Sequence, residues 1–194
     1  MNQQPKVYVI AGPNGAGKTT FASEFLPNYA DRPAFVNADT IASGLSGFSP
    51  NAVALKAGRL LLQQIETYAA KRINFAFETT LAGINYLSRL RRLQKAGYSV
   101  HIFFLWIPDV RLSLARVASR VKMGGPDISE RVVRRRFHKG IVNFFKHYRT
   151  TADSWVVFDN SGTVPHLIAD GRAGKVSIVD QRRYKRILEL MEGS

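Results

Sequence analysis

Apolar and polar positions along the chain predict strands and helices in alternation. Short apolar runs rich in β-branched and aromatic residues predict five buried strands, at residues 6–11, 33–38, 73–77, 99–107 and 154–158. Apolar residues that recur every three or four positions predict five amphipathic helices, over residues 18–26, 51–71, 84–96, 109–121 and 129–148. This order indicates a mainly parallel sheet with helices on both faces and ligands at the carboxyl ends of its strands.

The C-terminal part of the chain departs from this alternation. Two weaker apolar runs, 167–169 and 176–179, flank a polar turn and predict a small hairpin, and residues 181–191 predict a terminal helix. A chain of 194 residues with 45% hydrophobic composition can build one sizeable core. We therefore expect a single three-layer α/β/α domain over residues 1–194, with a five-stranded sheet and a C-terminal hairpin and helix over about residues 165–192.

Composition and charge indicate which kinds of binding partner and which cell compartment suit the chain. The chain has 28 Lys and Arg against 14 Asp and Glu, and the resulting net charge of +14 favours an anionic partner, either a small polyphosphate ligand or nucleic acid. The absence of cysteine excludes disulfides and thiolate metal sites and fits a reducing compartment. No apolar stretch approaches the roughly 20 residues of a membrane span, and Met1–Lys6 is too short and polar for a signal peptide. We expect a cytoplasmic protein without a membrane partner.

A glycine-rich segment at Gly12–Thr19 matches the phosphate-loop pattern G-x-x-x-x-G-K-[ST] and lies between a predicted strand and a predicted helix. Its glycines let backbone N–H groups face a phosphate, toward which the helix directs its positive end. Lys18 is then expected to reach the β- and γ-phosphates, and Thr19 to bind Mg²⁺. The motif predicts a P-loop NTPase fold with ATP and Mg²⁺ as cofactors. The candidate ATP-binding residues here are Gly12, Pro13, Asn14, Gly15, Ala16, Gly17, Lys18, Thr19 and Thr20.

The phosphate loop alone leaves the reaction open, because transporter-type ATPases share this string. Those proteins add an LSGGQ signature and a strand that ends in Asp-Glu. The nearest segment here, Leu45–Phe48, is incomplete and lies on the wrong side of the helix order. A transporter ATPase therefore remains only an alternative.

Two acidic positions follow neighbouring predicted strands, at the same rim as the phosphate loop. Asp39 lies just after the second strand, where its carboxylate suits a general base that takes the proton of an acceptor hydroxyl. Glu78 ends the third strand, where it suits Mg²⁺ or acceptor binding, and Thr79 and Thr80 offer further hydrogen bonds. The structural alternatives are that Asp39 caps the following turn together with Thr40 and that Glu78 serves as a helix-cap partner.

Arginines concentrate on the two helices around a Gly124-Gly125 loop. Arg116 and Arg120 share one helix face, and Arg135 and Arg136 lie on the helix that leaves the loop. Because a guanidinium binds phosphate oxygens in pairs and stays charged, residues 116–136 are expected to form a lid that closes over the triphosphate and excludes water. A solvated basic helix face is the alternative.

The polar segment after the fifth strand offers one more candidate ligand contact. Asn160 lies where nucleotide kinases of this layout place the loop that touches the base, and it is a candidate for binding adenine. An ordinary polar turn is an equal alternative.

Four motifs together resemble the zeta-toxin family of P-loop kinases, over roughly residues 6–161. These motifs are GPNGAGKTT at Gly12–Thr20, VNAD at Val36–Asp39, FETT at Phe77–Thr80 and RVASRVKMGGPDISERVVRRRF at Arg116–Phe137. The resemblance is greatest to a short branch that consists of the toxin domain alone. It implies an ATP-dependent kinase for the 3′-hydroxyl of the amino sugar in UDP-N-acetylglucosamine, and a separate antitoxin protein as partner.

Carried over by position, the resemblance implies a role for each matching residue. Lys18 and Thr19 look like the phosphate and Mg²⁺ residues and Asp39 like the catalytic base. Glu78 and Thr80 look like acceptor contacts and Arg120 like a lid arginine, with Arg135 or Arg136 as the second.

The chain also departs from its relatives. Pro126 follows Gly124-Gly125 where relatives often have histidine, and the longer sugar-binding segments of the plasmid toxins are missing. Another acceptor (a nucleotide, a sugar or an RNA end) therefore stays open, as does a non-catalytic module that ATP gates.

Overall fold

The chain alternates between strands and helices in its computed structural model, which describes residues 4–30, 33–45 and 50–192. Within these residues the strands are β1 (Lys6–Ala11), β2 (Ala34–Val36), β3 (Phe75–Thr79), β4 (Ser99–Trp106), β5 (Ser154–Asp159), β6 (His166–Arg172) and β7 (Lys175–Ile178). The helices are α1 (Lys18–Glu24), α2 (Ala38–Ser43), α3 (Pro50–Ala70), α4 (Asn85–Lys95), α5 (Val110–Lys122), α6 (Glu130–Asn143), α7 (Arg149–Thr151) and α8 (Gln181–Glu192). Most of the Leu45–Phe48 segment lies outside the described residues.

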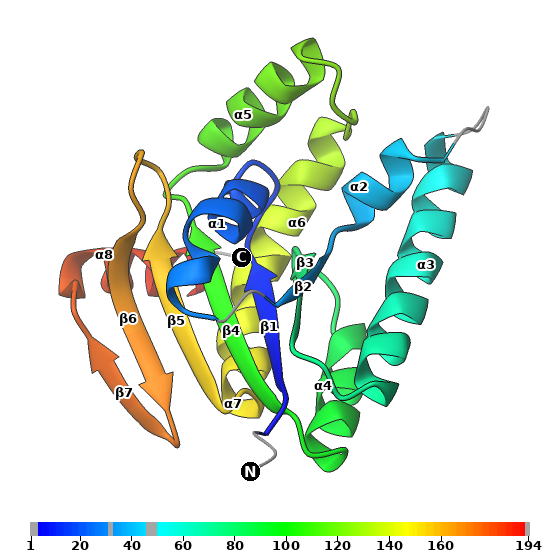
Figure 1. Cartoon of the computed structure of the whole chain (residues 1–194). Coiled ribbons are helices and arrows are strands. Elements are labelled where there is room, and N and C mark those ends of the chain that lie inside the picture. The colour runs from blue at the N-terminus through cyan, green and yellow to red at the C-terminus, as the bar shows by residue number, and fades with distance from the viewer. Residues whose placement is uncertain (1–3, 31–32, 46–49, 193–194) are drawn as a thin grey trace.

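The strands form one mixed sheet in the order β2-β3-β1-β4-β5-β6-β7 (Figure 1). β2, β3, β1, β4 and β5 are parallel, whereas β6 and β7 are antiparallel. The mainly parallel α/β fold is confirmed, but the sheet has seven strands instead of five, because the predicted C-terminal hairpin pairs with β5. Gly171 of β6 makes this pairing close: a Cβ there would lie 2.3 Å from the ring of Trp155, its partner in the register.

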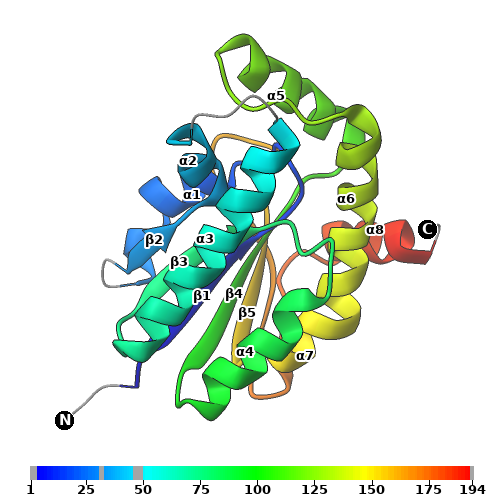
Figure 2. The ribbon, with the colours of Figure 1, turned by 90° about the vertical axis from the view of Figure 1, so that its right-hand side faces the viewer.

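Helices cover both faces of the sheet, as expected from the alternation (Figure 2). α1 lies on one face, and α4, α6, α7 and α8 lie on the other. The strands between them are almost fully buried, with Val7, Val9, Phe75 and Phe104 at 0% exposure. The helix predicted over residues 129–148 is α6 followed by a π-helical segment at Phe144–Tyr148, where Phe144 stacks on Phe104.

The pattern of apolar positions did not predict α2 or the three-residue helix α7. α2 follows β2 directly, and its cap is Asn37, whose Oδ1 accepts a hydrogen bond of 2.7 Å from the backbone N–H of Asp39. Asp39 itself lies in the first turn of this helix, where a carboxylate interacts favourably with the helix dipole.

α5 and the first part of α6 lie beyond the carboxyl end of the parallel strands, and the rest of α6 runs along the sheet (Figure 1). Asp109 caps α5, since its Oδ1 accepts a hydrogen bond from the backbone N–H of Arg111. Ser129 stands at the cap position of α6, but its side chain makes no capping hydrogen bond within the described part of the chain. None of the described helices is long and apolar enough to cross a lipid bilayer.

Candidate active site

The phosphate loop Gly12–Thr19 connects β1 to α1 and has a backbone that only glycine accommodates well. Gly12, Gly15 and Gly17 have φ angles of +142°, +73° and +79°, a region that other residues rarely adopt. Space is also short, because a Cβ on Gly12 would lie 2.3 Å from the Leu105 carbonyl oxygen. The loop therefore has the conformation that lets backbone N–H groups approach a phosphate.

Lys18 folds back across the loop at the start of α1. Its Nζ donates a hydrogen bond of 2.9 Å to the carbonyl oxygen of Pro13. Burial lowers the pKa of Lys18, while the negative charges of Glu78 and Asp39 oppose that shift. A buried ammonium whose hydrogen-bond partner is a neutral carbonyl would be stabilised by an anionic ligand. Phosphate oxygens are such a ligand.

Asn37 brings together the two residues predicted to bind Mg²⁺. Its Nδ2 lies 3.0 Å from Glu78 Oε1 and 3.4 Å from Thr19 Oγ1. Burial raises the pKa of Glu78, and the charge of Lys18 and a hydrogen bond from Thr19 act in the opposite direction. The sequence analysis missed Asn37 as a functional residue, although its position inside the VNAD motif, directly after a strand, was a usable signal.

The adjacent hydroxyl and carboxylate of Thr19 and Glu78 fit Mg²⁺, which in phosphate-binding sites takes few ligands from protein. The described residues contain no group of three or more His, Cys, Asp or Glu side chains that could hold a metal alone. The remaining ligands would thus be phosphate oxygens and water.

Asp39 and Arg120, predicted as base and lid arginine, form an ion pair across the site. Nη1 of Arg120 lies 3.2 Å from Oδ2 of Asp39, and Nη2 donates to the carbonyl oxygen of Pro126 at 3.2 Å. The Nε of Arg120 is buried and has no hydrogen-bond partner among the described residues. Arg120 thus spans from α5 to α2 with a donor still unsatisfied.

Arg135 and Arg136, the other arginines predicted for the lid, differ in how far they are buried. Arg136 is half-buried, and burial lowers its pKa, helped by the charge of Arg135 and opposed by Asp39. Arg135 is exposed. The geometry therefore favours Arg136 over Arg135 as the second arginine that faces the site.

The loop after β3 supplies the two threonines of the FETT motif. The hydroxyl of Thr79 accepts a hydrogen bond of 3.1 Å from the backbone N–H of Leu81, and that of Thr80 accepts one of 3.5 Å from Ala82. Each hydroxyl keeps its own proton as a donor for a further contact. Thr20, in contrast, is exposed on the first turn of α1.

Arg116 and Asn160 lie on the outer side of the phosphate loop. Asn160 Nδ2 donates to the Ala16 carbonyl oxygen at 2.7 Å. Arg116 donates to the carbonyl oxygens of Gly15, Asn160 and Ser161, at 3.2, 2.9 and 2.7 Å. Both side chains therefore contact the phosphate loop, and Arg116 also contacts the segment after β5.

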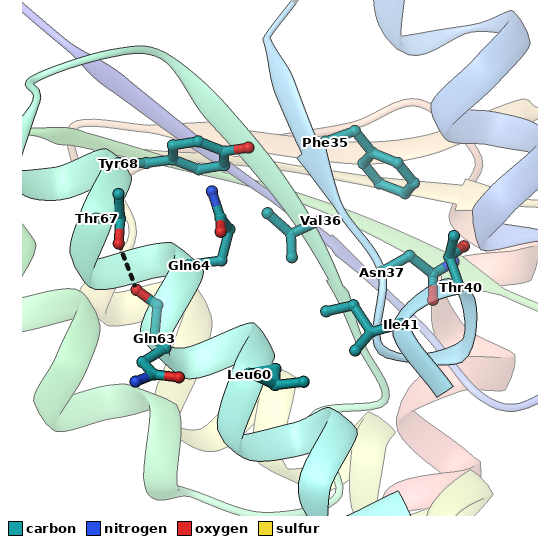
Figure 3. Close-up of a pocket in the computed structure, with 10 residues that line it drawn as sticks. All are labelled: Phe35, Val36, Asn37, Thr40, Ile41, Leu60, Gln63, Gln64, Thr67 and Tyr68. Atoms are coloured by element: carbon teal, nitrogen blue, oxygen red, sulfur yellow. Dashed lines mark hydrogen bonds between the residues drawn. The ribbon is translucent and has the colours of Figure 1, made fainter. Parts of the chain in front are cut away.

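A hollow of about 530 Å³ lies beside this site, between β2, α2 and α3 (Figure 3). None of its described lining residues is charged, and Asn37 and Thr40, on either side of Asp39 in sequence, belong to them. The full lining is Phe35, Val36, Asn37, Thr40, Ile41, Leu60, Gln63, Gln64, Thr67 and Tyr68.

Comparison with solved structures relates the whole architecture to two complexes. A crystal structure of AvrRxo1-ORF1:-ORF2 with ATP superposes with a TM-score of 0.77 at 18% identity, over 96% of this chain and 64% of the other. The PezAT chromosomal toxin-antitoxin system of Streptococcus pneumoniae gives a TM-score of 0.70 at 14% identity, over 99% of this chain and 86% of the other. The chain therefore shares their fold but spans less than two thirds of the AvrRxo1 chain.

Comparison of sequences is more specific. A Haemophilus influenzae protein described only as an uncharacterized protein is 31% identical over 134 residues, which are 69% of this chain and 94% of the relative. The family model described as zeta toxin matches residues 1–183. The match spans the phosphate loop, Asp39, Glu78 and the arginine-rich helices α5 and α6, and the chain belongs to the zeta toxin family.

Proposed function

We propose that this protein is an ATP-dependent kinase that transfers the γ-phosphoryl group of ATP to a sugar hydroxyl of a nucleotide sugar such as UDP-N-acetylglucosamine. The observation that carries the proposal is the meeting of Lys18, Thr19, Asp39, Glu78 and Arg120 at one end of the sheet. This set contains phosphate-binding groups, metal ligands and a base, which are the parts that phosphoryl transfer needs.

On the donor side, the phosphate loop binds the triphosphate through its backbone N–H groups. Lys18 exchanges the Pro13 carbonyl for oxygens of the β- and γ-phosphates, a stronger charge-assisted partner. Thr19 and Glu78 would hold Mg²⁺, which would supply neutralisation of the charge on the transferring phosphate. Arg120 and Arg136 approach from the lid and exclude water, a competing acceptor.

On the acceptor side, Asp39 takes the proton of the attacking hydroxyl. The new bond joins that oxygen to the γ-phosphorus, the bond from the γ-phosphorus to the β–γ bridging oxygen breaks, and ADP leaves with the electron pair. Glu78, Thr79 and Thr80 orient the acceptor by hydrogen bonds, and Arg135 remains a weaker candidate for the same role. The proposed contact of Asn160 with the base of ATP falls to its Oδ1, because its Nδ2 already donates to the Ala16 carbonyl oxygen.

The uncharged hollow beside α2 supports an acceptor with a neutral polar part. Thr40 extends from the helix of Asp39 into the lining, and Gln63, Gln64 and Thr67 offer amides and a hydroxyl. A sugar or a nucleobase satisfies such groups by hydrogen bonds. Gln64→Ala is then expected to raise the KM for the acceptor without changing the KM for ATP.

A separate antitoxin protein is part of the proposal, since the related PezAT structure is described as a toxin-antitoxin system. We also propose a cytoplasmic site of action, because ATP and nucleotide sugars are available there. Co-purification of this chain with a co-expressed candidate antitoxin would support the first statement, and failure of every candidate to bind would contradict it.

The decisive test is turnover of labelled ATP with UDP-N-acetylglucosamine by the wild type and by Asp39→Asn. The variant is expected to bind ATP normally, and its turnover number is expected to fall about 10²- to 10⁴-fold, the usual contribution of a general base. Asp170→Asn on β6, remote from the site, is the matched control. Unchanged turnover in Asp39→Asn would remove the base assignment, and multiple turnovers by the wild type would exclude a purely ATP-gated binding module.

The net charge of +14 favours one alternative acceptor, an RNA end. Binding that weakens steeply with salt and spans several phosphates would support it. A flat salt response together with transfer to the nucleotide sugar would reject it.

A further inference from the structure

Hydrogen bonds hold the main-chain carbonyl oxygens along the phosphate loop. The Pro13 carbonyl oxygen accepts from Lys18 Nζ and from the Ala16 N–H. The next three carbonyl oxygens, of residues 14, 15 and 16, accept from Ser113 Oγ, Arg116 Nη1 and Asn160 Nδ2 respectively. Three side chains from outside the loop thus bind three consecutive loop carbonyls.

These contacts determine where the loop N–H groups point. A trans peptide is planar and directs its C=O and N–H to opposite sides, and the described chain contains no cis peptide. A carbonyl of Asn14 or Ala16 held outward therefore turns the N–H of Gly15 or Gly17 inward. Donors fixed in advance bind an anion without the cost of reorganising the loop.

Ser113 is the most enclosed member of this set. It is 0% exposed in α5, and its hydroxyl donates to the Asn14 carbonyl oxygen. The loop also packs directly on this helix: a Cβ on Gly15 would lie 2.8 Å from the Ser113 carbonyl oxygen and 3.1 Å from Arg116 Cβ. Neither the loop nor the start of α5 can shift without the other.

The same helix face continues to the lid arginine. Ser113, Arg116 and Arg120 are spaced by three and four residues, so they follow one stripe of α5 over about 10 Å. One end of the stripe binds the phosphate loop, and the other end binds Asp39 through Arg120.

We infer that Ser113 and Arg116 are positioning residues that hold the phosphate loop in its ATP-binding conformation and fix the lid to it. The inference rests on the proposed kinase function and deepens it. It also changes the role expected for Arg116: its guanidinium acts through three main-chain carbonyls instead of through direct contact with phosphate.

Substitutions separate these two roles. Ser113→Ala removes one hydroxyl from a buried site at little cost in volume, and Arg116→Lys keeps the charge but loses the planar fork that reaches several carbonyls. If Arg116 acts by positioning, lysine is expected to fail nearly as badly as alanine. If it acts as a cation on phosphate, lysine is expected to retain most of the function.

The experiment measures ATP binding by calorimetry without an acceptor, then KM for ATP, KM for the acceptor and kcat. We expect Ser113→Ala and Arg116→Lys to weaken ATP binding about tenfold, the effect of one or two buried hydrogen bonds. KM for ATP is expected to rise and kcat to fall, with KM for the acceptor unchanged. Ser88→Ala, the same substitution at an exposed position on α4 outside the site, is the control.

Wild-type ATP affinity in Ser113→Ala, or near-normal function of Arg116→Lys, would overturn the inference. Thermal unfolding of each variant shows whether a loss comes from misfolding, and Arg116→Lys, at a half-buried position, provides the second variant if Ser113→Ala does not fold. Failure of the wild type to bind ATP would instead refute the proposed function.

Discussion

Replacing Gly140 with alanine tests whether α6 sets the position of the acceptor side of the site. Gly140 is buried where α6 crosses the loop after β3, and a Cβ there would lie 2.4 Å from the carbonyl oxygen of Thr80. Ordinary carbon–oxygen contacts lie at about 3.3–3.6 Å, so helix and loop must separate by roughly 1 Å. The contact atom of Thr80 is its main-chain carbonyl oxygen, so rotation of a side chain cannot relieve the clash. The backbone at Thr80 therefore has to move.

The expected effects on stability and activity differ in size. Overpacking costs about 1–3 kcal/mol, and replacing glycine by alanine inside a helix returns about 0.8–1.0 kcal/mol. The free energy of unfolding should therefore fall by only about 0–2 kcal/mol. A displacement of about 1 Å at a residue that orients the acceptor can cost 10²-fold in turnover.

Gly58→Ala in α3 is the matched control, since a Cβ there meets none of the described atoms within 4 Å. It should gain up to about 1 kcal/mol and keep full activity. The assays are urea unfolding, steady-state turnover and ATP binding, and binding should be unchanged in both variants. If Gly140→Ala were as stable as Gly58→Ala and turned over normally, the proposed control of Thr80 by α6 would be wrong.

Three further predictions follow from the same structure. Asn37→Ala should lower the free energy of unfolding by about 0.5–2 kcal/mol, because α2 loses its cap. Turnover should also fall, because Thr19 and Glu78 lose their common hydrogen-bond partner. A variant with wild-type stability and turnover would contradict this. Burial lowers the pKa of His101 below its ordinary 6.5, so the unfolded chain binds the proton more tightly than the folded protein does. The free energy of unfolding should therefore fall as the pH drops below about 6.5. Between pH 7.5 and 5.5, the Tm of His101→Gln should fall less than the Tm of the wild type. EDTA should stop ATP turnover and added Mg²⁺ restore it, whereas turnover that persists in EDTA would argue against a metal at Thr19 and Glu78.

Local patterns predicted most of the fold, and non-local pairing explains what they missed. The strands and long helices each carry enough apolar positions to show their period. α2 has six residues, too few for a helical period to emerge, and only its cap Asn37 marks it. The hairpin was visible as a hairpin, but its pairing with β5 depends on the fit of Trp155 over Gly171, 16 residues apart in sequence.

Site residues were predictable from sequence where they lie at the carboxyl end of a parallel strand, because that position determines their location in the fold. Asp39 comes shortly after β2 and Glu78 lies near the end of the neighbouring strand β3, so both had to lie near the phosphate loop. Arg135 and Arg136 could not be separated, because consecutive helical residues differ by about 100° and the phase of α6 depends on tertiary packing. Ser113 gave no signal, since a lone serine in a helix looks the same whether its hydroxyl binds a distant loop or not.

The ion pair between Arg120 and Asp39 bears on the order in which the two substrates add. One guanidinium cannot pair fully with both the carboxylate and an incoming triphosphate, and in this structure it pairs with the carboxylate. ATP, which carries more negative charge, should draw Arg120 away and leave Asp39 free for the acceptor hydroxyl. We therefore expect an ordered mechanism in which the donor binds first, with acceptor affinity that increases when a non-hydrolysable ATP analogue already occupies the phosphate loop.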